Sequence, residues 1–265
     1  MENRPIVSVV IPVYNCESTI RRSLSSIRNQ TYRDFETIIV NNNCSDNTIS
    51  IILDEFQDLP NLKVVHCKHQ GIVPALNTGL RHASGEWIAR QDGDDYWHPD
   101  KLEKQMSFLL NNPEVSILGT GINIFNTSGD QLQTGTMGNP VDYPPGDHSI
   151  KTLLLYGQNA ICHPSVVFNI KVVNTIGGYE QLFPLAEDLH MWLKAIPHFL
   201  FANLKERLVD YTQKQDDNYD ARVPVVLADW FYALYKDTGV VEGERQPRIY
   251  DWQLDPSHHG NPRKQ

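Results

Sequence analysis

The chain has 265 residues, of which 40% are hydrophobic and 21% are charged, and its formal net charge at pH 7 is −9. This length suffices for one large domain or two small ones with a substantial buried core. The acidic balance argues against general nucleic-acid binding, which needs a concentrated basic surface. No uninterrupted apolar run approaches the roughly 20 residues that a membrane span needs.

The N-terminal segment and the cysteines predict a cytoplasmic protein. The opening residues MENRPIVSVVIP lack the long apolar region of a signal peptide. Cys16, Cys44, Cys67 and Cys162 show no CxxC spacing, and this usage is typical of small buried thiols in a reducing compartment. Peripheral contact with the inner face of a membrane stays open, although the chain shows no strong amphipathic basic helix.

The first ninety residues alternate between strand and helix patterns. β-Branched apolar runs predict strands at 6–11, 35–40, 62–66 and 86–90. Helical periodicity predicts helices at 17–29, 47–56 and from 71 onward. Strands that alternate with helices in this way form a mostly parallel sheet, so the predicted class is α/β.

Polar clusters at 12–15, 41–46 and 91–95 follow three of these strands and therefore share one edge of the sheet. In the last cluster Asp92, Asp94 and Asp95 repel one another unless a cation lies among them. Mg²⁺ prefers oxygen ligands and often combines one or two carboxylates with substrate phosphates. The pattern indicates a metal and phosphate site, and the alternative is an acidic turn that caps a helix opened by Pro99.

The remaining chain carries weaker signals. The predicted elements are a helix at 99–111, a strand at 115–120, a loop at 126–139, a Pro- and Gly-rich connection at 142–148, a helix at 150–156, a strand at 164–170, a helix after 186–188, two strands at 199–203 and 207–211, and a helix at 222–235. The residues from 239 to 265 are polar with scattered aromatics, and His258-His259 is better explained as solvated surface than as a metal site.

Several ordered motifs resemble those of one known family. They are PVYN at 12–15, GIVPALNTGLRHASGEWIARQDGDD at 71–95, HPSVVF at 163–168 and GGYEQLFPLAEDLHMWLK at 177–194. Together they resemble the inverting family 2 glycosyltransferases, which have the Rossmann-like GT-A fold. The resemblance covers roughly residues 5–211. It implies a domain at 1–215, with a nucleotide-sugar half at about 1–120 and an acceptor half at about 121–215, followed by a helix and polar tail at 216–265.

The resemblance also assigns site residues. On the donor side it implies that Pro12, Val13, Tyr14, Asn42 and Asp92 border the nucleotide. Asp94, together with Asp92, would hold a divalent metal, Mn²⁺ or Mg²⁺, and Asp188 would be the general base. On the sugar and acceptor side it implies Asp95, and Trp97, His163 and Glu187 are further candidates for that side because of their places in the sequence. Local alternatives remain open: Tyr14 as an edge aromatic, His163 as a structural histidine, and Glu187-Asp188 as acids favoured by the helix dipole.

The implied activity is metal-dependent, inverting transfer of one hexosyl or N-acetylhexosaminyl group from a nucleotide-diphosphate sugar to a glycan or lipid-linked acceptor, as in polysaccharide biosynthesis. No QxxRW-type element of processive members is present. Asn41-Asn42 replaces the usual acidic pair, and 212–215 lacks the Arg and His of many relatives. A sugar-nucleotide-binding protein without transferase activity is therefore the rival. A nucleotidyltransferase or dehydrogenase would need a Gly-rich loop after the first strand, which PVYNCES does not offer.

Overall fold

A computed structural model of the chain describes residues 5–127, 139–180, 186–214, 222–236 and 238. The strands are β1 Val7–Val13, β2 Phe35–Asn41, β3 Lys63–His66, β4 Trp87–Arg90, β5 Tyr96–Trp97, β6 Val115–Thr127, β7 Asn139–Val141, β8 Val167–Asn169 and β9 Leu200–Lys214. The helices are α1 Ile20–Arg28, α2 Thr48–Glu55, α3 Ile72–His82, α4 Lys101–Asn111, α5 Asp147–Leu155, α6 Ile170–Ile176, α7 Glu187–Ala195 and α8 Arg222–Tyr235.

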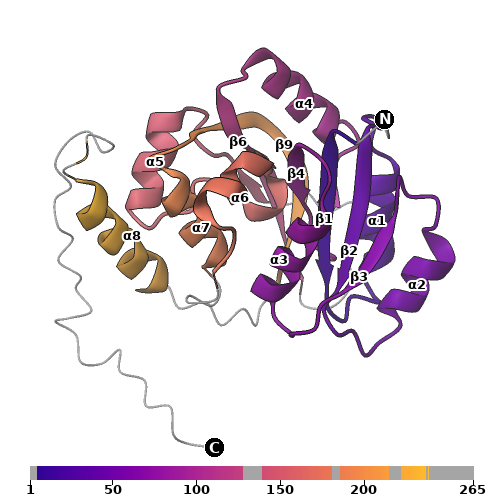
Figure 1. Ribbon diagram of the computed structural model, residues 1–265. Helices are drawn as coiled ribbons and strands as arrows, with labels where there is room; N and C mark the ends of the chain where they lie inside the picture. Colours follow the sequence, from indigo (N-terminus) through magenta and orange to yellow (C-terminus); the bar gives the residue numbers. More distant parts are fainter. Residues whose placement is uncertain (1–4, 128–138, 181–185, 215–221, 237, 239–265) are drawn as a thin grey trace, which may run out of the picture.

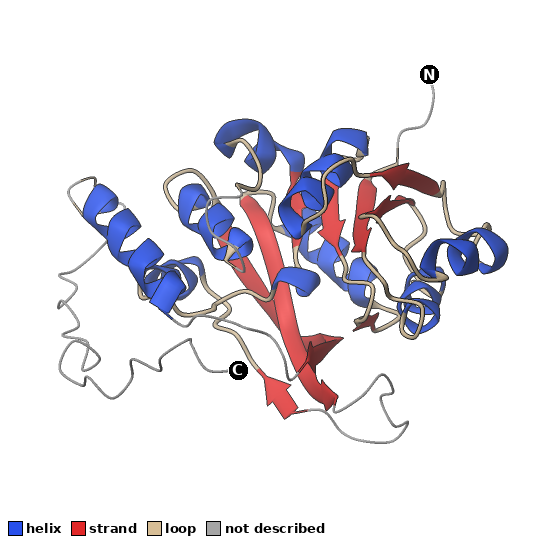
Figure 2. Cartoon of the chain, turned by 90° about the horizontal axis from the view of Figure 1, so that it is seen from below, coloured by secondary structure: helices blue, strands red, loops and turns tan. Residues whose placement is uncertain are grey.

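All strands belong to one sheet in the order β3-β2-β1-β4-β8-β6-β9-β5, with β7 paired to β6 (Figures 1 and 2). The first four strands are mutually parallel, and every residue of β1 is buried, as expected for a strand covered on both faces. The predicted α/β fold with its parallel sheet is confirmed in this half. The second half is mixed, because β8 runs antiparallel to both β4 and β6 while β9 runs parallel to β6.

Side chains alternate between the two faces of the sheet and so define two hydrophobic cores. Val10 and Ile88 pack with α3 and with α5 to α8, whereas Val9 and Ala89 pack with α1, α2 and α4. The period of two along each strand produces this division. Residues that follow the strands at their carboxyl ends are thus flanked by α1 on one face and by α3 and α7 on the other.

Two predicted elements differ in the structure because of long-range pairing. The segments 199–203 and 207–211 form one strand, β9, since Thr120 pairs with Leu204 and Gly121 with Arg207, which leaves the two residues between them as a bulge. The strand predicted at 164–170 is shorter. A 3₁₀ turn at His163–Ser165 precedes β8, because Pro164 has no N–H for a sheet ladder.

The helix expected to open at Pro99 starts later. Tyr96 and Trp97 first pair with β9 as strand β5, and α4 then begins at Lys101. The Pro99 carbonyl accepts a hydrogen bond of 2.8 Å from the Thr31 N–H, which holds this residue in the preceding turn. The acidic turn is consequently joined to a short strand and not directly to a helix.

Some predictions fall on residues that the structure does not describe. These are most of the loop at 126–139 and the tail from 239, with His258-His259, together with the side chain of Lys214. Within the described ranges no helix combines the length and apolarity required to cross a bilayer. The four cysteines form no disulfide; Cys67 and Cys162 are buried, and Cys16 and Cys44 are half-buried.

Gly79 allows α3 to approach the sheet closely, which supports a first prediction. A Cβ at this position would lie 2.3 Å from Val10 Cγ1 and 3.2 Å from Val40 Cγ2, both branched side chains in a packed core. We expect Gly79→Ala to lower the free energy of unfolding by about 1–3 kcal/mol despite the better helix propensity of Ala. Urea denaturation followed by circular dichroism would measure this.

Gly146→Ala is the matched control, because nothing lies within 4 Å of a Cβ built at Gly146. Its free energy of unfolding should stay within about 0.5 kcal/mol of the wild type. Equal effects of the two substitutions would contradict the close approach of α3 to β1.

Candidate active site

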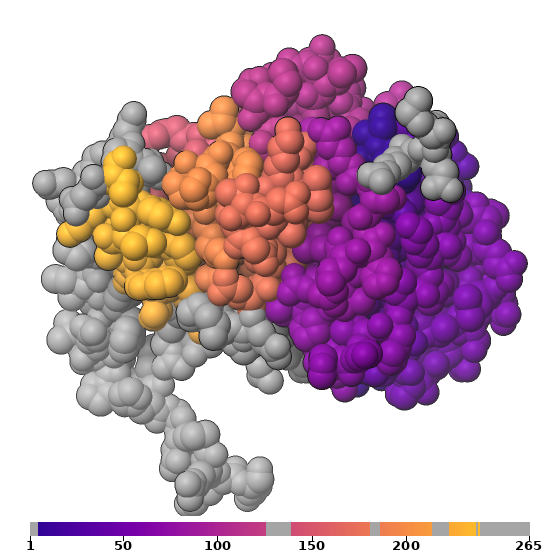
Figure 3. All heavy atoms as spheres, viewed as in Figure 1, coloured from indigo at the N-terminus to yellow at the C-terminus, as the bar shows by residue number. Residues whose placement is uncertain are grey.

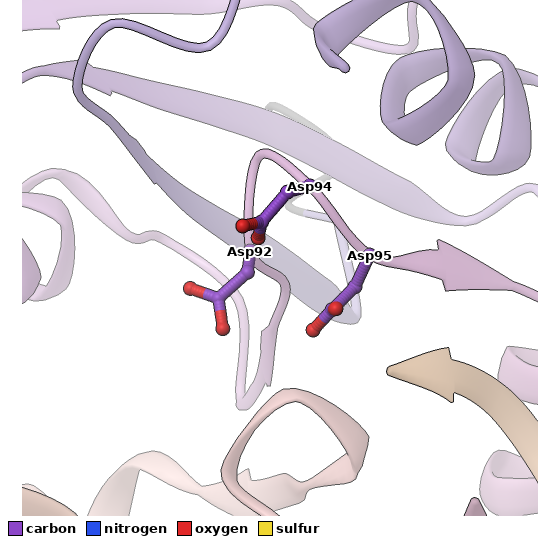
Figure 4. A group of neighbouring side chains, drawn as sticks. All are labelled: Asp92, Asp94 and Asp95. Atoms are coloured by element: carbon purple, nitrogen blue, oxygen red, sulfur yellow. The ribbon is translucent and has the colours of Figure 1, made fainter. Parts of the chain in front are cut away.

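Three carboxylates gather in the turn that follows β4. One oxygen from each of Asp92, Asp94 and Asp95 lies within 4.8 Å of the others, and Figure 4 shows the three side chains extending from a single turn. Because metal–oxygen distances are roughly 2.0–2.6 Å, two ligands of one ion lie at most about 5 Å apart. The spacing of the three oxygens therefore suits one divalent cation.

Side chains of the α1 segment hold the backbone of this turn. The Thr19 hydroxyl donates to the Gly93 carbonyl at 2.9 Å, and the Ser23 hydroxyl donates to the Asp92 carbonyl at 2.8 Å. Arg22 Nη2 donates to the Asp94 carbonyl at 2.6 Å. The backbone carbonyls of the turn are satisfied in this way without the carboxylates of Asp92 and Asp94.

Gly93 lets the turn pack against the end of β1. A Cβ there would lie 2.9 Å from Cys16 Sγ and 3.4 Å from Val13 Cγ1. Strand β9 closes the turn from the other side, because Thr212 donates its hydroxyl to the Asp94 carbonyl and its N–H to Asp95 Oδ1, both at 2.7 Å. Thr212, which lies in the segment that lacks the Arg and His of many relatives, thus holds the acidic turn in place.

Asp95 gives the strongest indication that the acidic turn suits a cation. It is fully buried, and its Oδ2 has no hydrogen-bond partner in the described part of the chain. Burial, followed by the charges of Asp92 and Asp94, raises the pKa of Asp95 well above its usual range. A buried unpaired carboxylate oxygen is costly, and a divalent cation would relieve it, so the residues present fit a metal site.

Arg90 is the cation already built into the site. It is 5% exposed, and it forms an ion pair with Asp92. Burial alone would lower the pKa of Arg90, but the Asp92 carboxylate, together with Tyr179 and Asp95, outweighs this effect and the pKa is raised. The sequence reading did not single out this residue. Strand alternation could have done so, because Arg90 lies two residues beyond Ile88 and hence on the face covered by α7.

The first turn of α7 contains two further acids, Glu187 and Asp188, on which the charge of Arg90 acts. Glu187 is 8% exposed and Asp188 is partly exposed. Burial raises the pKa of Asp188, although the Leu189 N–H, at 2.7 Å from Oδ1, and the charge of Arg90 both favour its carboxylate. Burial, with the charge of Asp188, raises the pKa of Glu187 to about 7. The charge of Asp92 also raises the pKa of Glu187, so the acids of the turn and those of α7 interact electrostatically.

The titration of Glu187 predicts a pH-dependent stability. Its pKa is about 7 in the folded chain, against 4.5 for an ordinary Glu. Ionisation of Glu187 above pH 4.5 therefore opposes folding, and the loss of stability is complete above pH 7. We expect Glu187→Gln to raise the free energy of unfolding by up to about 3 kcal/mol at pH 8 and by much less at pH 5. Urea denaturation at the two pH values would measure the difference.

Glu180→Gln is the control, because the pKa of Glu180 is shifted in the opposite direction from that of Glu187. The Glu180 carboxylate pairs with Lys194, which lowers its pKa, so its removal should not stabilise the protein at pH 8. A gain in stability from Glu187→Gln that is equal at both pH values would mean that Glu187 is not buried in its charged form.

His163 lies in the wall of the site as a buried, neutral histidine. Its Nε2 and the Tyr179 hydroxyl are 2.8 Å apart, and burial, with the charge of Arg90, holds the pKa of His163 well below its usual range. Asn77 fixes Tyr179 in turn, since its Nδ2 donates to the Tyr179 carbonyl at 2.8 Å and its Oδ1 accepts from the Tyr179 N–H at 3.1 Å. These contacts favour a structural role for His163.

The residues expected to border the nucleotide lie at the ends of β1 and β2. Pro12 and Val13 are buried within β1, whereas Tyr14 is 49% exposed and its ring is available for stacking. Asn42 is 6% exposed, its Oδ1 accepts a hydrogen bond from the Gly71 N–H at 3.0 Å, and its own N–H donates to the Val13 carbonyl. Asn42 therefore ties the end of β1 to the start of α3.

Trp97 does not support the role expected for it on the sugar side. It is fully buried, its indole N–H donates to the Pro164 carbonyl at 3.0 Å, and the Lys101 ammonium lies 3.7 Å from the ring centroid. Pairing of β5 with β9 turns the ring into the core. No face of Trp97 is left for a sugar, and we correct that assignment.

Comparison with known proteins identifies the group to which these features belong. Residues 8–175 match the family described as glycosyl transferase family 2. The putative glycosyltransferase EpsE of Bacillus subtilis is 30% identical over 223 residues, which cover 82% of this chain and 76% of EpsE. The O-antigen biosynthesis glycosyltransferase WbnJ of Escherichia coli is 31% identical over 210 residues, which cover 78% and 79% of the two chains.

Two solved structures share the fold. S. aureus TarS 1–349 in complex with UDP-GlcNAc gives a TM-score of 0.61 at 20% identity and covers 82% of this chain. The mannosyltransferase PcManGT from Pyrobaculum calidifontis, in complex with GDP-Man and Mn²⁺, gives 0.58 at 20% identity and covers 93% of it. The chain spans 60% of TarS 1–349 and 67% of PcManGT, so these likenesses concern the fold of the shared part.

Proposed function

This chain belongs to glycosyltransferase family 2, and from that premise we propose that it is a metal-dependent, inverting, non-processive enzyme. It moves one sugar from a nucleotide-diphosphate donor to a hydroxyl of a glycan or lipid-linked acceptor, in the cytoplasm. One observation carries the proposal. The buried guanidinium of Arg90 pairs with Asp92 of the turn after β4, and its charge also acts to lower the pKa values of Glu187 and Asp188 at the start of α7, which are distant in sequence. A single site thus offers one carboxylate group for a metal and another for a proton.

The donor half of the proposal rests on the acidic turn. Asp92 and Asp94, with the unpartnered Oδ2 of Asp95, would hold the cation, and the bound ion would neutralise the charge that develops on the departing diphosphate. Carboxylates and phosphates suit both Mn²⁺ and Mg²⁺. The Mn²⁺ and GDP-Man bound to PcManGT and the UDP-GlcNAc bound to TarS support a nucleotide-sugar donor.

Asp188 is the proposed general base. An inverting transfer is one in-line displacement, so the acceptor hydroxyl must lose its proton to a carboxylate opposite the leaving group. Asp188 is partly exposed, and its Oδ1 is oriented by the Leu189 N–H, whereas Glu187 is buried beside it. A mere pair of first-turn acids would be solvated, and the burial of Glu187 without a partner for Oε2 speaks for a functional reason.

The rival function is sugar-nucleotide binding without transfer. The observation that favours it is the engagement of Asn42 Oδ1 by Gly71, which leaves the donor base without the side-chain acceptor expected there. Base recognition would then depend on stacking against Tyr14 and on other groups. The two functions differ in turnover and not in binding.

Calorimetric titration tests the proposal. UDP, GDP, dTDP and CDP are each titrated with and without Mn²⁺, and we expect tight binding of one nucleotide only when the metal is present. Release of that nucleoside diphosphate from its sugar conjugate on addition of acceptor glycans then separates the transferase from the binding protein. If none of the four binds, with or without metal, the proposed function is wrong.

A further inference from the structure

A basic pocket outside the acidic site opens between α3 and the segment after β3. Its volume is 590 Å³, within the range of small-molecule sites, and α3 lies on the face shown in Figures 1 and 3. Five basic side chains line it: His66, Lys68, His69, Arg81 and His82. Among the residues that the structure describes, no acidic side chain lines it, although the chain as a whole carries a net charge of −9. This separation of charge favours an anionic ligand.

The pocket is lined by one lysine and one arginine, Lys68 and Arg81. Neither Lys68 nor Arg81 forms an ion pair with a carboxylate in the described ranges, whereas several exposed cations elsewhere do, such as Arg21 with Glu55. A basic surface that only keeps the protein soluble would not need to be concave or free of acids. Among the described residues, therefore, no carboxylate paired with Lys68 or Arg81 competes with an anion that enters the pocket.

Arg81 is held in place before any ligand arrives. Its Nη2 donates to the Thr78 hydroxyl at 2.8 Å, and that hydroxyl donates to the Pro74 carbonyl one turn earlier, also at 2.8 Å. The remaining N–H groups of the guanidinium keep their planar fork, which matches phosphate oxygens. Less conformational entropy is lost when an anion binds to a group that is already oriented.

The segment with Lys68 is also fixed. Asn43 Nδ2 donates to the Cys67 carbonyl at 3.2 Å, and Cys67 Sγ donates to the His69 carbonyl at 3.0 Å. The contacts of the buried Cys67 thus fix the backbone from Cys67 to His69, from which the side chains of Lys68 and His69 extend. One wall of the pocket is thus fixed by the contact of the Arg81 guanidinium with Thr78, and the other by the contacts of Cys67.

Tyr179 connects this pocket to the proposed active site without making them one. Tyr179 lines the pocket, while its hydroxyl contacts His163 in the wall beside Arg90. Tyr14, Asn42, Asp92, Asp94 and Asp188 do not line it. The pocket thus starts at the wall of the reaction site and extends away along α3.

We propose that this pocket binds a phosphate group carried by the acceptor. The inference rests on the proposed function, because it assumes that an acceptor hydroxyl lies at Asp188. An arginine fork and a lysine are the usual partners of phosphate, and the volume leaves room for a phosphate with an adjoining sugar. A soluble phosphate ester and the phosphate of a lipid-linked sugar offer the same chemistry, and the test separates these two sources.

The test measures binding of phosphate probes without metal, so that the acidic turn does not contribute. Calorimetry with glycerol 1-phosphate and inorganic pyrophosphate reports the soluble source, and flotation with vesicles of phosphatidylcholine containing 20 mol% phosphatidic acid, roughly the charge of an anionic leaflet, reports the lipid source. The variant is Lys68→Gln/Arg81→Gln. Lys171→Gln/Lys205→Gln removes the same charge from exposed positions outside the pocket.

We expect the pocket variant to weaken probe binding by about tenfold or more, since two charge-assisted contacts are lost, and the control to match the wild type. Binding of the soluble esters alone assigns the pocket to a soluble phosphate, and vesicle binding that depends on Lys68 and Arg81 assigns it to a lipid phosphate. The proposal is overturned if the wild type binds no probe, or if both variants lose affinity equally.

A separate titration of the nucleoside diphosphate with Mn²⁺ keeps this test independent of the proposed function. Its affinity should be unchanged in the pocket variant. If it falls, Lys68 and Arg81 belong to the donor site and the acceptor pocket is rejected. If phosphate binds to the pocket while no nucleotide binds anywhere, the transferase proposal fails and the anion site stands.

Discussion

Asp94→Asn is expected to lower the rate of sugar transfer by about 10³-fold or more, because it removes a proposed ligand of the metal. A bound metal would lower the energy of the transition state by several kcal/mol by stabilising the charge on the leaving diphosphate. Asn keeps the size of the side chain, and the turn itself is held by backbone contacts from Thr19, Arg22 and Ser23. The measurement is the initial rate of nucleoside diphosphate release with Mn²⁺. Calorimetry of the same variant should show that nucleotide binding no longer depends on metal.

Stability separates this outcome from a structural role of the turn. In the absence of metal, Asp92 and Asp94 both raise the pKa of the buried Asp95 by repulsion, so loss of one charge should not destabilise the protein. A structural cap would behave in the opposite way and would lose stability on substitution. A variant that is less stable but keeps its metal dependence would contradict the metal site.

Asp100→Asn provides the matched control. Asp100 lies shortly after the acidic turn, but its carboxylate pairs with Lys104 on the surface. It should leave both the transfer rate and the metal dependence close to wild type, because exposed ion pairs contribute little.

The elements that local patterns could predict are those built from contiguous residues. β1, β2 and β4 are short apolar runs that end in polar turns, and the three carboxylates of the acidic turn are neighbours in sequence. Parallel pairing then brings the ends of β1, β2 and β4 to one edge, which the strand and helix alternation already implied. The acidic turn and its neighbours were therefore accessible without coordinates.

The contacts that the sequence did not reveal join distant segments. Arg22 and Thr212 are 190 residues apart, yet Arg22 Nη2 donates a hydrogen bond to the Thr212 hydroxyl. Both side chains also donate to the Asp94 carbonyl. Trp97 follows the acidic turn as an exposed aromatic would, yet pairing with β9 buries it. Neither outcome leaves a local signal, because each depends on where β9 returns to the sheet. Arg90 is different, since the two-residue period of β4 indicates its face.

Asp188→Asn is expected to lower the turnover number by about 10²–10⁴-fold, the usual cost of losing a positioned base. Donor binding should stay the same, because the acidic turn is untouched. Asn can still accept the Leu189 N–H through Oδ1, so the local geometry is retained. In the wild type, protonation of Asp188 should reduce transfer at a pH above that of an ordinary Asp, because burial raises its pKa. This acidic limb should be absent from the residual activity of the variant.

Asp147→Asn tests whether any acid in the first turn of a helix gives the same result. Asp147 occupies the first turn of α5, where its Oδ1 accepts the Phe201 N–H at 2.8 Å and its carboxylate pairs with Lys151. We expect it to affect stability and not turnover. Asp147→Asn should reduce turnover by less than about tenfold. If Asp188→Asn has an equally small effect, Asp188 is an acid favoured by the helix dipole and not the general base. Glu187 could not replace it directly, because its carboxylate is buried. If Asp188→Asn alone causes a large loss of turnover while donor affinity is unchanged, Asp188 acts in proton transfer and not in metal binding.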